Sequence, residues 1–294
     1  MDQIAHGADW IKVYADRKYF RRPDGSIRSL PNFTADELAA IVDQAHRTGL
    51  RVAAHSMTPT GHALALGAGV DTIEHGPVLD DATIATMVKQ GTYWCPTAMT
   101  LAHVAPERGK TNPIWLALRD AEEDSFRRAL KAGVKIALGT DAGAFRWDES
   151  NQAEELAWYV AHGMTTWQAL RAATVVPAEL LDRKGELGTL APGARADLVA
   201  LAADPIADVA ALQHANASLR LGGWNLVFST PDLHRWHHAA DPRHARSNYG
   251  STLIVWDLLL GTRALPEGAP GRYGIEGESV APQGIRAQLG EPWG

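Results

Sequence analysis

Four side chains that could bind a metal ion or move a proton are spaced along the first half of the chain, namely Lys12, His55, His75 and Asp141. Neutral imidazoles and carboxylates are common zinc ligands, and a divalent cation lowers the pKa of bound water to about 7. A carboxylate beside that water can pass its proton to a leaving group. Together these residue types would suit metal-dependent hydrolysis.

Lys12 is unusual because it lies within the apolar stretch WIKVYA at residues 10–15. A buried ammonium group is unfavourable by several kcal/mol unless it is paired or neutralised. Carbamylation would neutralise it, since a carbamate is anionic and can bridge two cations.

Each of these residues also has a structural interpretation that stays open when it is taken alone. A histidine at a strand end is more often hydrogen-bonded within the fold than bound to metal. Lys12 could extend its amine to solvent at a sheet edge, and Asp141 could cap the next helix. Four such groups at successive strand ends favour a shared site over four separate explanations.

The elements that would position these residues alternate from residue 10 to about 180. Strands are expected at residues 10–15, 51–56, 70–76, 92–97 and 134–143. Helices are expected at about residues 34–49, 59–68, 80–90, 113–132, 151–163, 166–175 and 177–182. Strands separated by helices indicate a parallel sheet, and His55, His75 and Asp141 fall near the carboxyl ends of its strands. Both parallel barrels and doubly wound sheets build their sites there, so periodicity alone does not choose between them.

Composition excludes some classes of function. The chain has 294 residues and a formal net charge of -6, so we expect no nucleic-acid partner, which would need a basic face. The single cysteine, Cys95, excludes an internal disulfide and a multi-cysteine zinc site. No secretory signal is visible at the start, and the longest apolar stretch, near residues 251–261, is about half of the roughly 20 residues that a membrane helix needs. We therefore expect no membrane-spanning segment, and a cytoplasmic location is favoured although the compartment is not readable.

Several segments carry a family resemblance in a fixed order. They are IKVYAD with Lys12, AAHS with His55, IEHG with His75, LGTDAG with Asp141, and later GELGTLAPGARADLVAL. Over about residues 3–212 this set resembles the later strands of the amidohydrolase superfamily, in particular its imidazolonepropionase-like and Xaa-Pro dipeptidase-like members. The resemblance implies a partial (β/α)8 TIM-type barrel, equivalent to strands 4–8, followed by a remnant of a small β-domain.

The resemblance also implies a role for each candidate residue. Lys12 would be the carbamylated ligand that bridges two metal ions, and His55 and His75 would bind the second ion. Asp141 would bind the first ion and act as the general base. The expected cofactor is a divalent metal, with zinc favoured.

The activity implied is hydrolysis of a C–N bond in a small amide, dipeptide or cyclic imide. Tyr14 and Arg17 follow the lysine strand and could hold a substrate carboxylate, because arginine binds carboxylates bidentately. A position in a surface loop explains these two residues equally well.

Part of the family pattern has no counterpart here. Only eleven residues precede Lys12, and no His-x-His motif occurs there. We therefore expect a truncated barrel that holds one metal ion through Lys12, His55 and His75. Such a chain should hydrolyse substrates weakly or not at all, and should self-associate through its open barrel edge.

A second group of histidines lies in the tail, in HRWHH at residues 234–238, followed by NYGSTLIVWDLLLGT. Residues 214–275 resemble the end of the fatty acid hydroxylase (sterol desaturase) superfamily, whose members are membrane non-haem diiron enzymes. The resemblance implies iron as the metal of this cluster, and imidazole clusters suit iron. The candidate ligands are His214, His234, His237 and His238. A histidine-rich surface that binds metal adventitiously is the simpler alternative.

These observations predict four regions along the chain. They are a partial barrel at 1–183, a β-domain remnant at 184–213, a hydroxylase-like segment at 214–263 and an irregular tail at 264–294. Three functions stay open, namely a metal-dependent amidohydrolase, a fragment of a diiron hydroxylase, and a non-catalytic fusion product. The longer match favours the first.

Overall fold

The computed structural model describes residues 6–145, 152–195 and 204–207. The chain divides into two units, and every element named below belongs to the unit that comprises Met1–Asp197 and Ile206–Gln213. No helix within the described ranges is both long enough and apolar enough to cross a membrane.

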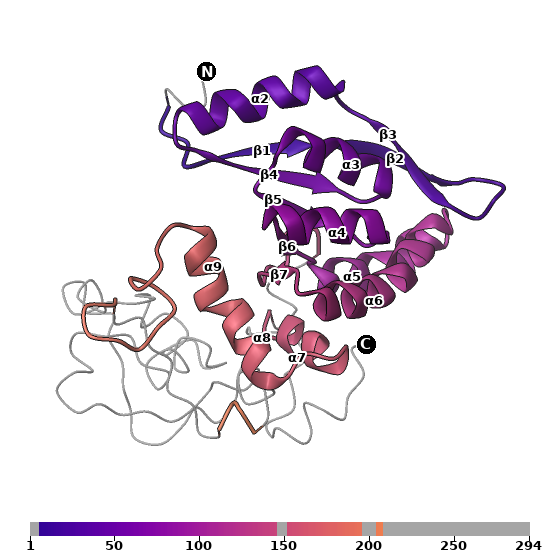
Figure 1. Cartoon of the computed structure of the whole chain (residues 1–294). Helices are drawn as coiled ribbons and strands as arrows, with labels where there is room; N and C mark the ends of the chain where they lie inside the picture. The colour runs from indigo at the N-terminus through magenta and orange to yellow at the C-terminus, as the bar shows by residue number, and fades with distance from the viewer. Residues whose placement is uncertain (1–5, 146–151, 196–203, 208–294) are drawn as a thin grey trace, which may run out of the picture. The chain divides into compact units, whose positions relative to one another are not determined.

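Five strands form a parallel sheet whose order in space, β1-β4-β5-β6-β7, follows their order in the chain (Figure 1). The strands are β1 (Trp10–Tyr14), β4 (Arg51–Ser56), β5 (Thr72–His75), β6 (Tyr93–Cys95) and β7 (Lys135–Ile136). A sequential order is that of a barrel wall, whereas a doubly wound sheet reverses its order at a switch point. The mixed α/β fold confirms the prediction of a partial barrel-type sheet, and the described strands do not close into a barrel.

Helices follow the strands and cover one face of the sheet. They are α2 (Ala35–Arg47), α3 (Pro59–Ala68), α4 (Asp81–Gln90), α5 (Ala98–Gly109), α6 (Ile114–Ala132), α7 (Glu154–Ala161), α8 (Thr166–Ala173) and α9 (Val175–Leu180). Local sequence fixes their ends, as in α2, where Thr34 and Glu37 form a capping box.

The two faces of the sheet differ in burial because side chains alternate along each strand. Val52, Ile73 and Trp94 are fully buried in the main core with residues of the covering helices. On the opposite face, His55 and Glu74 are only half-buried. Both faces of a parallel sheet are normally covered. A face that is only half-buried and carries polar side chains is therefore a candidate for a functional site.

Two features differ from the expected elements. An antiparallel hairpin, β2 (Asp16–Arg21) and β3 (Ile27–Pro31), follows β1, and α5 occupies a region where no helix was expected. The hairpin turns at Asp24 and Gly25, where Asp24 accepts a hydrogen bond from the Ser26 amide at 2.9 Å. In α5, Pro106 inside the helix hides the helical pattern.

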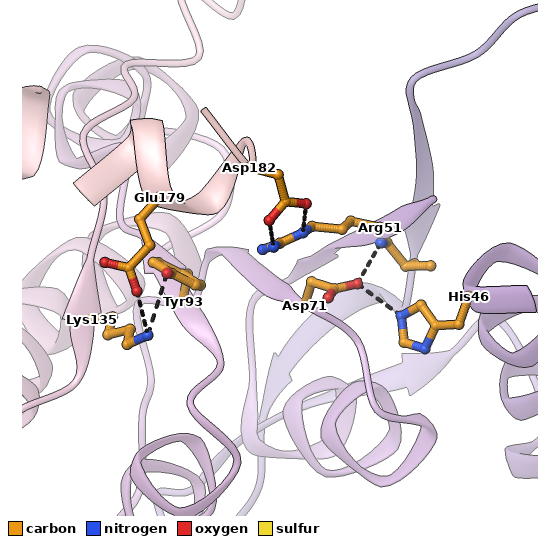
Figure 2. Close-up of polar contacts among 8 residues, drawn as sticks. His46, Arg51, Asp71, Tyr93, Lys135, Glu179 and Asp182 are labelled. Atoms are coloured by element: carbon orange, nitrogen blue, oxygen red, sulfur yellow. Dashed lines mark hydrogen bonds and ion pairs between the residues drawn. The ribbon is translucent and has the colours of Figure 1, made fainter. Parts of the chain in front are cut away.

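Polar contacts join elements at the amino end of the sheet (Figure 2). Asp71, before β5, accepts from the Val52 amide at 2.7 Å and pairs with His46 at 2.9 Å. At the start of β4, Arg51 pairs with Asp182, which follows α9. At the start of β7, Lys135 pairs with Glu179 of α9 at 3.1 Å. All of these contacts lie at the amino end of the sheet, opposite the carboxyl end where the candidate site is expected.

Candidate functional site

Lys12 and His55 lie on the same face of neighbouring strands, where the lysine is exposed and the histidine half-buried. The parallel register pairs Lys12 with Ala53 and Tyr14 with His55. Residues two apart on a strand share a face, so all four side chains project to the same side. The lysine in the middle of β1 and the histidine near the carboxyl end of β4 therefore lie on one face of adjacent strands.

Unusual backbone conformations mark the ends of the next strands. His75, Thr97 and Asp141 have φ values of 70°, 55° and 52°. Such left-handed conformations are uncommon for residues other than glycine and cluster at functional sites. His75 pairs in register with Ser56, which is buried on the helix side, and the left-handed turn carries the imidazole to His55.

The two candidate histidines contact each other directly. Their ring centroids are 4.6 Å apart at an interplanar angle of 65°. Tyr14 stacks on His55 with centroids 4.4 Å apart. The Tyr19 hydroxyl lies 2.8 Å from His55 Nε2, and the Thr97 hydroxyl lies 2.7 Å from His75 Nδ1. Each imidazole thus has one nitrogen in a hydrogen bond, which leaves Nδ1 of His55 and Nε2 of His75 for another ligand.

Burial and charge keep both imidazoles neutral at physiological pH. Burial lowers the pKa of His55 to about 4, with a further contribution from the nearby Lys12 ammonium. Burial lowers the pKa of His75 to about 3, and His55 and Lys12 add to the effect. Neutral imidazole is the form that binds metal.

Lys12 and Asp141 are electrostatically coupled across the same site. Partial burial lowers the pKa of the Lys12 amine, while Glu74, Cys95 and Asp141 raise it. Burial raises the pKa of Asp141, and Lys12 lowers it. The charge of Lys12 thus acts on both histidines and on Asp141, whereas Asp141 does not contribute to the pKa shift of either histidine.

The donor set fits a metal ion through its two neutral imidazoles. Among the residues whose placement is described, no three His, Cys, Asp or Glu side chains gather as a metal site. Lys12 as a third, carbamylated ligand stays a prediction, and burial lowers the pKa of its amine. Binding of the metal by Asp141 stays a prediction.

The remaining sequence candidates have different surroundings. Tyr14 is 57% exposed beside His55, as a substrate-contacting residue would be. The Arg17 guanidinium donates to the Asn32 side chain at 2.7 Å, so its role toward substrate stays a prediction. The tail candidates lie outside the described residues, namely His214, His234, His237 and His238.

Sequence reasoning missed Tyr19 and Thr97. Both act through hydrogen bonds to residues on other strands, 36 and 22 positions away. Thr97 is the last residue of the strand predicted at residues 92–97, and this strand-end position was the one available signal. The tyrosine lies in the unpredicted hairpin and gave none.

Comparison with known proteins finds a second family in the tail. The fatty acid hydroxylase family matches residues 189–262. Ornithine lipid hydroxylase OlsE from Rhizobium tropici is 42% identical over 83 residues, which cover 28% of this chain and 24% of that protein. The predicted resemblance of the tail to that family is confirmed.

The larger part of the chain has longer matches. The amidohydrolase family matches residues 1–219. Ochratoxinase from Aspergillus niger is 30% identical over 241 residues, covering 80% of this chain and 49% of that protein. A crystal structure of a Xaa-Pro dipeptidase with bound methionine in the active site is similar with a TM-score of 0.64 and 33% identity, covering 72% of this chain and 53% of the dipeptidase. The chain thus spans about half the length of these relatives, and with its parallel sheet and histidine pair it belongs to the amidohydrolase family.

Proposed function

We propose that the carboxyl end of the sheet is a metal-dependent site that hydrolyses a C–N bond in a small amide, dipeptide or cyclic imide. The observation that carries this proposal is the contact between two neutral imidazoles, His55 and His75, whose pKa values the nearby Lys12 amine also lowers. The names of the relatives, ochratoxinase and Xaa-Pro dipeptidase, support an amide or dipeptide substrate.

Each residue has a distinct task in this proposal. His55 and His75 would hold the metal through the nitrogens that their hydroxyl partners leave available, and a carbamylated Lys12 would supply an anionic oxygen. The metal, with zinc favoured, would supply electrophilic activation of the scissile carbonyl and of water. Asp141 accepts the proton from the attacking water and gives it to the leaving amine, a task for which its raised pKa is suited.

We propose that Lys12, His55 and His75 together hold one metal ion. The expected truncation, and the region boundaries near residues 183, 213 and 263, stay predictions.

Metal analysis after dialysis against metal-free buffer tests the proposal. We expect about one zinc ion per chain, lost in His55→Ala. The matched control is His46→Ala, which removes a histidine at the opposite end of the sheet and should retain zinc. No retained metal, or equal retention in both variants, would contradict the proposal.

The match of the tail to the fatty acid hydroxylase family favours a second candidate function, an iron site at the tail histidines. Here retained iron should be lost in His237→Ala while zinc bound by His55 is unaffected. Iron that is unchanged in His237→Ala excludes this assignment, and absence of both metals favours a non-catalytic product.

A further inference from the structure

A buried carboxylate outside the candidate site holds the start of the helix beside it. Glu155 lies on α7 and is 0% exposed. Its two oxygens accept hydrogen bonds from the backbone amides of Ala98 at 2.8 Å and Met99 at 2.9 Å. These amides belong to the first turn of α5, where helix geometry leaves N–H groups without partners.

The residue that would ordinarily cap this helix is turned elsewhere. Thr97 is the N-cap of α5 but makes no side-chain capping hydrogen bond. Its hydroxyl instead lies 2.7 Å from Nδ1 of His75. A threonine at an N-cap normally accepts from the helix's own amides. Glu155 occupies two amides of the first turn, while the Thr97 hydroxyl is bonded to the histidine and not to the helix.

The backbone at Thr97 needs such support. A β-branched residue with a φ of 55° is a genuine outlier, which persists only when its surroundings fix it. Thr97 is 4% exposed and is followed by the two amides that Glu155 binds. Loss of the carboxylate would free Thr97 to return to a common conformation and to cap α5 itself.

We propose that Glu155 is a positioning residue that orients His75 through the first turn of α5 and the Thr97 hydroxyl. This rests on the proposed function only in treating His75 as a metal ligand. Partners that orient metal-binding histidines typically change metal affinity by about 10- to 100-fold when they are mutated.

Glu122 supplies a matched control. It lies on α6, is 1% exposed, and leaves Oε1 without a hydrogen-bond partner. Burial raises its pKa, with contributions from Glu155 and Glu123. Glu122→Gln therefore alters a buried acid in the same part of the fold without touching the amides of Ala98 and Met99.

The test uses the full chain and two readouts, the ring ¹⁵N shifts of His75 by NMR without metal and the affinity for zinc alone. Glu155→Gln places an amide donor against one of the two backbone donors, so it should shift the His75 signals and lower zinc affinity about 10- to 100-fold. Glu122→Gln should change neither. Should Glu155→Gln not fold, Glu155→Met removes the acceptor without adding a donor.

A double-mutant cycle with Thr97 separates positioning from general destabilisation. Thr97→Val should reproduce the effect on His75, Thr97→Ser should preserve the wild-type signals, and Glu155→Gln should add nothing further to Thr97→Val. Unchanged His75 signals in a folded Glu155 variant, additive effects, or an equal response to Glu122→Gln would overturn the proposal. If the wild type binds no zinc while His75 still responds to Glu155, positioning holds and the proposed function fails.

Discussion

At the scale of single residues, hydroxyl groups determine which ring nitrogen of each candidate histidine is left to bind a ligand. Tyr19 engages Nε2 of His55, whereas Thr97 engages Nδ1 of His75, so the two rings offer opposite nitrogens. In neutral imidazole one nitrogen is a donor and the other an acceptor. The hydroxyl partners therefore determine that Nδ1 of His55 and Nε2 of His75 are the nitrogens whose lone pairs could bind one cation.

We predict that Tyr19→Phe lowers zinc affinity about 10-fold, because the ring remains while the hydrogen bond to His55 is lost. The matched control is Tyr14→Phe, which keeps the ring that stacks on His55 and should bind zinc as the wild type does. Isothermal titration with zinc alone measures both. Equal affinities for the two variants would show that the Tyr19 hydroxyl does not orient the ligand.

A second residue-scale prediction concerns His62, which is fully buried in α3. Burial lowers its pKa from 6.5 to about 4. Below pH 6.5 the His62 imidazole is protonated in the unfolded chain but stays neutral in the folded chain. The free energy of unfolding therefore falls as the pH drops toward 4. In His62→Gln this contribution, at most about 3 kcal/mol, should disappear. Urea unfolding of both proteins across this pH window checks it, and parallel stability curves would refute it.

At the scale of elements, periodicity predicted the βα units well because each strand and helix buries a continuous apolar pattern. The strand expected at residues 134–143 is only Lys135–Ile136, since the remaining segment turns to present Asp141. The hairpin β2–β3 escaped prediction although PDGS marks its turn. His55, His75 and Asp141 could be chosen because they lie near strand ends, and Lys12 because it lies inside an apolar strand. Their metal-binding roles came from the family resemblance and stay predictions. Glu155 could not, because its partners lie 56 and 57 residues earlier.

The turn that ends β5 depends on Gly76. It has a φ of 61°, and an added Cβ would lie 2.9 Å from Trp94 Nε1 and 3.2 Å from a side-chain carbon of Ile73. Gly76→Ala should therefore destabilise the fold by about 2–4 kcal/mol through backbone strain and overpacking. The control is Gly67→Ala in α3, where nothing lies within 4 Å. It should stabilise the helix by up to about 1 kcal/mol. Denaturant unfolding distinguishes the two, and equal stabilities would contradict the steric argument.

The polar contacts at the amino end of the sheet should contribute unequally. Asp71→Ala leaves the buried Val52 amide without its acceptor and should lower stability by about 1–3 kcal/mol. Asp182→Ala removes an ion pair whose carboxylate is 72% exposed, and should lower stability by at most about 1 kcal/mol. Thermal and urea unfolding measure both changes. A larger loss of stability in Asp182→Ala than in Asp71→Ala would contradict this ranking of the two contacts.

At the scale of the whole molecule, the described sheet has one face packed beneath helices and one face half-buried. Its outer strands, β1 and β7, each pair with a single neighbour among the described strands. Unpaired strand edges and incompletely covered faces promote association with other chains. The same exposure that makes the site accessible therefore favours contact between copies.

We predict that the chain associates as its concentration rises, through the open edge of the sheet at β1 and the half-buried face beside it. Ala53 lies on this face, in register with Lys12, so Ala53→Glu should weaken association by adding a charge there. Ala63→Glu places the same charge on an exposed position of α3 and serves as the matched control. Sedimentation velocity over a wide concentration range measures the effect. High salt should leave wild-type association intact, because salt screens charges but not apolar or backbone contacts. A monomer at every concentration, or equal weakening by both variants, would show that this face does not mediate association.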